Sequence, residues 1–139
     1  MSSQIDDLDH PGARELLRSQ PPLARLAYTG HDGFPRVIPI GFVWDGGRIV
    51  MSTTPTAPKV RALLARPQVA LTIDTADTSA SNQNPAARAL LVRGVASMEI
   101  VDGEPYTQSA RISIEPTWAR YYDFGAGRVP EFLLRPGQP

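Results

Sequence analysis

The sequence predicts a mainly β protein, a small six-stranded antiparallel barrel with short helices at its ends. Apolar residues alternate with other residues in six segments, and Asp-Gly pairs at 32–33 and 45–46 supply tight turns between the first three. Two short stretches have instead the apolar spacing of amphipathic helices. We therefore expect one domain over residues 1–139, of which residues 1–22 form an N-terminal helical leader.

The first half of the chain is expected to hold one helix and three strands. The helix is predicted at 11–19, with Pro11 near its start and Leu16 and Leu17 on its buried side. Three strands are expected at 23–30, 36–44 and 48–53, and the turns that join them are expected at 31–35 and 45–47. Because two tight turns join these three strands, we predict that they form an antiparallel meander.

The second half begins with a short helix at 56–67, for which Thr56 is the expected N-cap, with Pro58 in the first turn and Pro67 at the end. Gly94 is expected to mark a bulge or bend. The remaining elements are a strand at 68–75, a loop at 76–87, strands at 88–101 and 110–116, and an aromatic terminal segment at 117–124.

Composition excludes several classes of function. The chain has 14 basic and 14 acidic residues, so bulk charge indicates no nucleic-acid or membrane-surface binding. It has no apolar run of about 18 residues and no signal-peptide pattern, and we expect a cytoplasmic protein. Cysteine is absent and the two histidines are His10 and His31, which excludes thiolate ligands and a zinc site with several histidines, and a Ser-His-Asp triad would have to use one of the two. We predict no metal ligand and no catalytic side chain. An enzyme of this composition would take its chemistry from a bound cofactor.

The second strand predicts a covered outer surface. Ile38 and Ile40 lie on one face, Pro39 and Gly41 lie on the other, and neither face is polar. One face can line the barrel. A subunit partner or a flat ligand would then cover the other face.

Lys59 is the single lysine beside 13 arginines, and it lies in the first turn of the second helix. A helix start favours an anion, and Thr53, Thr54 and Thr56 add hydroxyl groups close by. These residues form a plausible phosphate cradle. A helix cap beside a solvated lysine is the plainer interpretation, and the local pattern taken alone favours it.

Several motifs occur in a familiar order. They are "DGFP", "PIGFVWDGGRIVMST", Lys59 at the start of a helix, "RPQVALTID" and "LLVRGVASM". In order and spacing they resemble the FMN-binding split-barrel family related to pyridoxamine 5′-phosphate oxidase, which includes deazaflavin-dependent members. The resemblance covers residues 23–74 and 90–98.

The resemblance implies a split barrel that forms a homodimer, with FMN or a deazaflavin coenzyme between the subunits. Lys59, Thr53 and Thr54 would hold the cofactor phosphate. The ring system would lie along Ile38, Pro39, Ile40, Gly41, Met51 and Ser52. Trp118 and its aromatic neighbours either pack in the core or an interface, or reach the cofactor of the other subunit and stack on it.

Two departures from the family are visible. Ala57 and Pro58 stand where many relatives carry an arginine or another polar residue, and only residues 102–109 connect the last two strands, where relatives usually have a helix. Outside this pattern, Arg36 and Arg93 are expected to form ordinary ion pairs, with contact to the cofactor as the alternative. His31 is expected to be exposed, and Asp32 is assigned to turn chemistry.

The leading hypothesis is a flavin- or deazaflavin-dependent oxidoreductase that acts on a small organic substrate. The alternatives are a non-catalytic flavin or haem carrier of the same fold, and a barrel without a cofactor. The sequence leaves open the substrate, the electron donor, the choice among FMN, deazaflavin and haem, and whether the short connection at 102–109 is natural.

Overall fold

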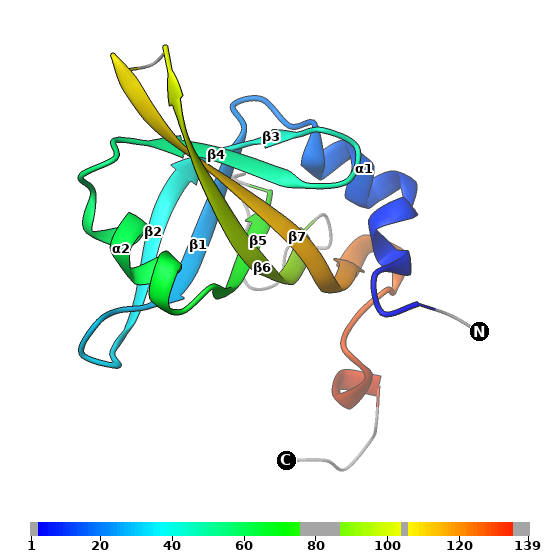
Figure 1. Cartoon of the computed structure of the whole chain (residues 1–139). Helices are drawn as coiled ribbons and strands as arrows, with labels where there is room; N and C mark the ends of the chain where they lie inside the picture. Colours follow the sequence, from blue (N-terminus) through cyan, green and yellow to red (C-terminus); the bar gives the residue numbers. More distant parts are fainter. Residues whose placement is uncertain (1–2, 76–86, 104–105, 135–139) are drawn as a thin grey trace.

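The computed structural model describes residues 3–75, 87–103 and 106–134, which form a strongly bent sheet with helices at its ends (Figure 1). The helices are η1 (Asp6–Asp9), α1 (Pro11–Leu17), α2 (Pro58–Ala65), η2 (Phe124–Ala126) and η3 (Glu131–Leu134). The strands are β1 (Leu23–Thr29), β2 (Pro35–Gly41), β3 (Val43–Trp44), β4 (Ile49–Thr53), β5 (Gln68–Asp74), β6 (Arg88–Asp102) and β7 (Gln108–Asp123).

The strands form a single antiparallel sheet in the order β2-β1-β5-β6-β7-β4-β3. The meander prediction is therefore wrong, because β4 pairs with β7 and not with β2. The predicted strand at 36–44 is broken at Phe42, whose side chain is buried while its neighbours on both sides are in different strands. This bend moves the chain from one edge of the sheet to the other, which explains why a run with continuous β pattern does not form one strand.

The barrel is open between β2 and β4. Within the part of the chain that the structure describes, β2 pairs only with β1, and Met51–Thr53 of β4 pair only with β7. Among the described residues, β2 and β4 share no hydrogen-bonded ladder, and the two strands border the split on its two sides. The predicted split barrel is confirmed, with a short seventh strand, β3, added to the expected six.

The barrel interior is filled by alternate side chains of the strands. Leu26, Leu71, Ile112 and Ile114 are buried there. The helix α1 and the turn η1 cover one end (Figure 1), and the prediction that Leu16 and Leu17 are buried is confirmed. A His10 side-chain nitrogen caps α1 by accepting the Gly12 N–H at 3.0 Å.

Strands β6 and β7 form a long two-stranded ribbon whose tip projects from the barrel (Figure 1). The predicted strand at 110–116 and the aromatic segment at 117–124 belong to this ribbon, because β7 runs through Trp118 and Tyr121 as far as Asp123. The predicted irregularity at Gly94 is confirmed by a register shift between Arg93 and Gly94. A side chain there would meet the carbonyl oxygen of Glu115, since an added Cβ would lie 2.5 Å from it.

Both Asp-Gly pairs lie in turns between strands, and their glycines have the predicted positive φ. Gly33 and Gly46 have φ values of 83° and 97°, which glycine adopts readily. The helix predicted at 56–67 is shorter, at Pro58–Ala65, and its N-cap is Ala57, which makes no side-chain hydrogen bond. The Thr56 cap prediction is therefore wrong. The predicted loop at 76–87 lies outside the described residues except for its last residue.

Candidate functional site

The predicted cofactor residues of β2 divide between the two faces of the strand. Ile38 and Ile40 are half-buried toward the core, whereas Pro39 and Gly41 are exposed on the outer face. The outer face continues through Val37 and Val43, which are 69% and 65% exposed. The expectation that both faces are covered is therefore not met within one chain, and the outer face is available to a partner or ligand.

On β4, the predicted residues also alternate. The side chain of Met51 is 1% exposed and packs in the core, so it can border the opening only through its backbone. Ser52 is exposed on the outer face, and Thr53 is 6% exposed. Because β2 and β4 line opposite sides of the split, the two predicted stretches face one opening although they are not paired.

Lys59 lies at the wide end of the split. Its Nζ donates to Thr53 Oγ1 at 3.1 Å, and its side chain is half-buried. The ammonium group is thus held close to the end of β4 instead of extending into solvent. This geometry brings together Lys59 and Thr53, two of the three residues predicted to hold a phosphate, and Thr54 follows directly.

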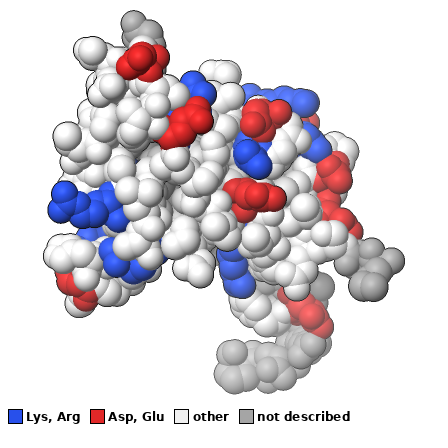
Figure 2. Space-filling model, viewed as in Figure 1, with Lys and Arg blue, Asp and Glu red and all other residues white. Residues whose placement is uncertain are grey.

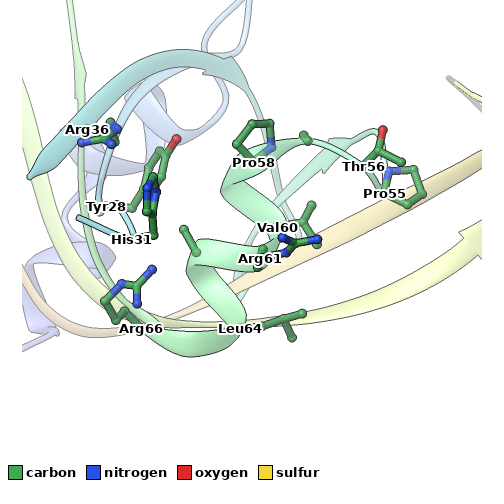
Figure 3. Close-up of a pocket in the computed structure, with 13 residues that line it drawn as sticks. Tyr28, His31, Arg36, Pro55, Thr56, Pro58, Val60, Arg61, Leu64 and Arg66 are labelled. Atoms are coloured by element: carbon green, nitrogen blue, oxygen red, sulfur yellow. The ribbon is translucent and has the colours of Figure 1, made fainter. Parts of the chain in front are cut away.

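A groove of about 710 Å³ opens beside this point, between the β1–β2 hairpin and α2 (Figure 3). Tyr28, His31 and Arg36 line its hairpin side, and Arg61 and Arg66 line its α2 side. Residues 55–58, which lead into α2, form one end of it. Tyr28, Arg61 and Arg66 were not predicted as site residues, because no local pattern in the sequence shows that the hairpin packs against α2.

Arg36 forms the ordinary ion pair that was predicted. One guanidinium nitrogen lies 3.1 Å from Asp32 Oδ1, and another donates to the Phe34 carbonyl at 2.9 Å. This guanidinium and the Phe34 N–H lower the pKa of Asp32, in line with its assignment to turn chemistry. The pair holds Arg36 at the mouth of the groove.

Trp118 lies on the outer face of the ribbon, between two guanidinium groups. The Cζ atoms of Arg93 and Arg120 are 4.2 and 4.9 Å from its ring centroid. Arg93 therefore stacks on an aromatic ring, and the ion pair predicted for it is absent among the described residues. Trp118 lies eight positions along β7 from Ala110, the partner of Thr53, which corresponds to about 26 Å measured along the strand. Trp118 is thus remote from Lys59 of the same chain.

Neither histidine lies in the split. His10 caps α1 and packs on the Tyr121 ring at 4.7 Å between centroids, and His31 is exposed in the hairpin turn, as predicted. Among the residues that the structure describes, no three His, Cys, Asp or Glu side chains are grouped as a metal site would require. Within the same residues, no helix is long and apolar enough to cross a membrane.

The sequence profile of the pyridoxamine 5′-phosphate oxidase family matches residues 10–131, which is most of the chain. The chain belongs to this family. The match includes both strands of the split, Lys59 and the groove, as well as Trp118. No curated protein matches the sequence.

Several solved structures superpose on the chain. An F420 reductase is 28% identical over 76% of this chain and 94% of its own, with a TM-score of 0.61. The haem storage protein HutZ from Vibrio cholerae is 20% identical over 77% of this chain and 89% of its own, with a TM-score of 0.62. A conserved hypothetical protein from Mycobacterium tuberculosis is 19% identical over 94% of both chains, with a TM-score of 0.66. The last two likenesses show the fold alone.

Proposed function

We propose that this chain is a flavin- or deazaflavin-dependent oxidoreductase that acts on a small organic molecule. The observation that carries the proposal is the split between β2 and β4, with the Lys59 ammonium held 3.1 Å from Thr53 Oγ1 at its wide end. A positive charge and hydroxyl groups suit a cofactor phosphate. The exposed backbone near Gly41 and Ser52 leaves space for a flat ring along the outer side of the two strands.

The chain's own residues would bind and orient the cofactor. Lys59, Thr53 and Thr54 would hold its phosphate, while β2 and β4 would keep its ring at a constant position. The bound cofactor would supply the hydride transfer. This division of roles agrees with the lack of a predicted catalytic side chain.

We infer that the working unit is a homodimer. The outer face of β2 exposes Val37 and Val43, and apolar surface of this kind suits a subunit interface. Trp118 lies eight positions along β7 from Ala110, the partner of Thr53, and so stands apart from Lys59 in the sheet. In a dimer, the Trp118 of one subunit could stack on the cofactor bound at the split of its partner.

Titration of the purified apoprotein with FMN and with coenzyme F420, followed by flavin fluorescence, tests this function. Lys59→Ala should weaken binding of the preferred cofactor by about 1.5–3 kcal/mol, because a charge-assisted contact is lost. Lys59→Arg keeps the charge and should recover part of the affinity. Unchanged affinity in Lys59→Ala would show that the phosphate is held elsewhere.

A haem carrier is the second candidate, since HutZ shares the fold. The described residues speak against it, because His10 is engaged in the α1 cap and His31 lies in an outer turn. Visible absorption of the protein after incubation with haemin separates the two functions. A Soret band that survives gel filtration would favour the carrier.

A further inference from the structure

The edge of β7 that faces away from β6 has no neighbouring strand over its second half. Strand β4 pairs with residues 110–114, and within the described residues no strand pairs with this edge beyond Ile114. The N–H groups of Ala119, Tyr121 and Asp123 point to this edge, where unpaired backbone donors would be costly. Each of the three nevertheless has an acceptor, and none of the acceptors lies in one of the seven strands.

Residues 3–9, here called the N-terminal segment, supply two of the three acceptors. The Gln4 carbonyl accepts the Ala119 N–H at 2.9 Å, and Asp7 Oδ2 accepts the Tyr121 N–H at 2.8 Å. Leu8, which is 5% exposed, anchors the same segment in the core. The N-terminal segment thus lies along β7 in the place of a partner strand.

Residues 124–134, here called the C-terminal segment, supply the third acceptor. The backbones of Arg128 and Asp123 exchange two hydrogen bonds, at 2.8 and 2.9 Å. Arg128 Nε also donates to the Tyr121 carbonyl at 2.8 Å. Tyr121 therefore has its N–H bound by one terminal segment and its carbonyl bound by the other.

The two segments meet in the ion pair between Asp7 and Arg128. Arg128 Nη2 lies 2.8 Å from Asp7 Oδ1, so the carboxylate uses one oxygen for the guanidinium and the other for β7. The Asp7 side chain is 22% exposed, and a partly buried carboxylate that loses its cation is costly to keep in place. Figure 2 shows acidic and basic side chains close together on the side of the molecule where α1 lies, so an ion pair alone is not unusual there. This pair is distinguished because both of its partners also bind the backbone of β7.

We propose that Asp7 and Arg128 form a latch that holds the N-terminal and C-terminal segments on β7 as one cooperative unit, independently of any cofactor. Each segment holds the residue that completes the other, so release of one should release the other. Opening would expose the N–H groups at 119, 121 and 123, and an unpaired strand edge of this kind favours pairing with another strand. Arg120 links the latch to Trp118, because its Nη1 donates to the Gln4 carbonyl at 3.3 Å and its Cζ lies 4.9 Å from the Trp118 ring centroid. A closed latch therefore also holds Arg120 beside Trp118.

Amide hydrogen exchange of the purified full chain, followed by NMR, tests the latch. Asp7→Asn keeps an oxygen for the Tyr121 N–H but removes the charge that binds Arg128. It should speed exchange of the Arg128 N–H about threefold, although the hydrogen bond from this N–H to the Asp123 carbonyl is unaltered. Asp7→Ala also loses the bond to β7, and exchange should then be about tenfold faster.

The coupling should be measurable from the other segment as well. Arg128→Gln should speed exchange of the Ala119 N–H about threefold, because this donor is bound by Gln4 in the N-terminal segment. In the double variant Asp7→Asn/Arg128→Gln, exchange of both N–H groups should be no faster than in Arg128→Gln alone. The signal of the Trp118 indole N–H should shift in both single variants.

Asp9→Asn is the matched control, because Asp9 lies in the same turn, η1, and pairs with Arg14 at 2.6 Å, but among the described residues it makes no hydrogen bond to β7. It should leave both exchange rates and the Trp118 signal unchanged. In the unmodified protein, the N–H groups of residues 119 and 128 should exchange faster than the amides of β5, which would show that the segments open while the barrel stays folded.

Three results would overturn the latch: exchange that changes only in the segment that carries the substitution, additive effects in the double variant, or rates at residues 119 and 128 equal to those of β5. A Trp118 signal that stays in place in both single variants would overturn the link to Arg120.

Discussion

Single polar side chains set the tight turns of this molecule. Asp45 Oδ1 accepts the N–H groups of Gly47 and Arg48 at 3.0 and 2.6 Å, and it thereby closes the turn between β3 and β4. Asp32 accepts the Phe34 N–H at 3.0 Å in the equivalent turn between β1 and β2. Each aspartate thus combines a backbone contact with a following glycine of positive φ.

The turn at Asp45 predicts a pH dependence of stability. The N–H groups of Arg48 and then Gly47 lower the pKa of Asp45 below its ordinary value, so the folded state favours the carboxylate. A lowered pKa contributes stability above the unfolded pKa of about 4, and that contribution is lost as the pH falls through the folded value. Asp45→Asn should remove this part of the acid sensitivity. Urea unfolding between pH 2.5 and 6 measures it, and identical pH slopes in the two proteins would contradict the assignment.

At the scale of elements, the long β6–β7 ribbon determines how the barrel is assembled. It pairs with β5 on one side and with β4 on the other, so it joins the two groups of strands on either side of the split. The irregularity at Gly94 lies where the ribbon passes from β5 toward β4. A bulge increases the bend and twist of a strand, which is what closure requires.

Gly94→Ala should therefore destabilise the fold. The new methyl group would lie 2.5 Å from the Glu115 carbonyl oxygen, which belongs to the backbone and cannot rotate away. We expect a loss of about 1–3 kcal/mol in the free energy of unfolding, measured by chemical denaturation. Gly47→Ala is the control, because no atom lies within 4 Å of its added Cβ and its φ is not in the left-handed range. Equal stability of the two variants would show that the bulge is not sterically required.

At the scale of the whole molecule, the outer face of β2 is the surface that we expect a second subunit to cover. Its apolar residues are exposed, its backbone edge is unpaired, and Trp118 lies far from the site that it was predicted to join. Natural edge strands of this kind are usually covered. A second copy would cover the face and could bring an aromatic ring to each split.

Val37→Glu should convert the proposed dimer into a monomer and weaken cofactor binding together with it, because it places a charge on this face. Sedimentation velocity measures the oligomeric state, and cofactor titration measures the loss of binding. Leu133→Glu, at an exposed apolar residue in η3, is the control that should leave both unchanged. A dimer that persists in Val37→Glu with full cofactor affinity would exclude this face as the interface.

The sequence by itself determined the β class, the Asp-Gly turns, the buried face of α1, the bulge at Gly94 and the Lys59 candidate. These features depend on local chemistry, because alternation, positive φ and helix spacing are set by neighbouring residues. The family resemblance added the split barrel. It also predicted a cofactor site whose residues on β2, on β4 and at Lys59 lie along one opening, whereas Trp118 lies apart from them.

Only the tertiary structure decided which strands pair and which side chains share a groove. The pairing of β4 with β7 joins segments about 60 residues apart, and no pattern within either strand specifies it. The break at Phe42 depends on closure of the barrel, so the local β pattern of residues 36–44 could not reveal it. The groove between the β1–β2 hairpin and α2 has the same origin, because Arg36, Arg61 and Arg66 line it only when the hairpin lies against α2.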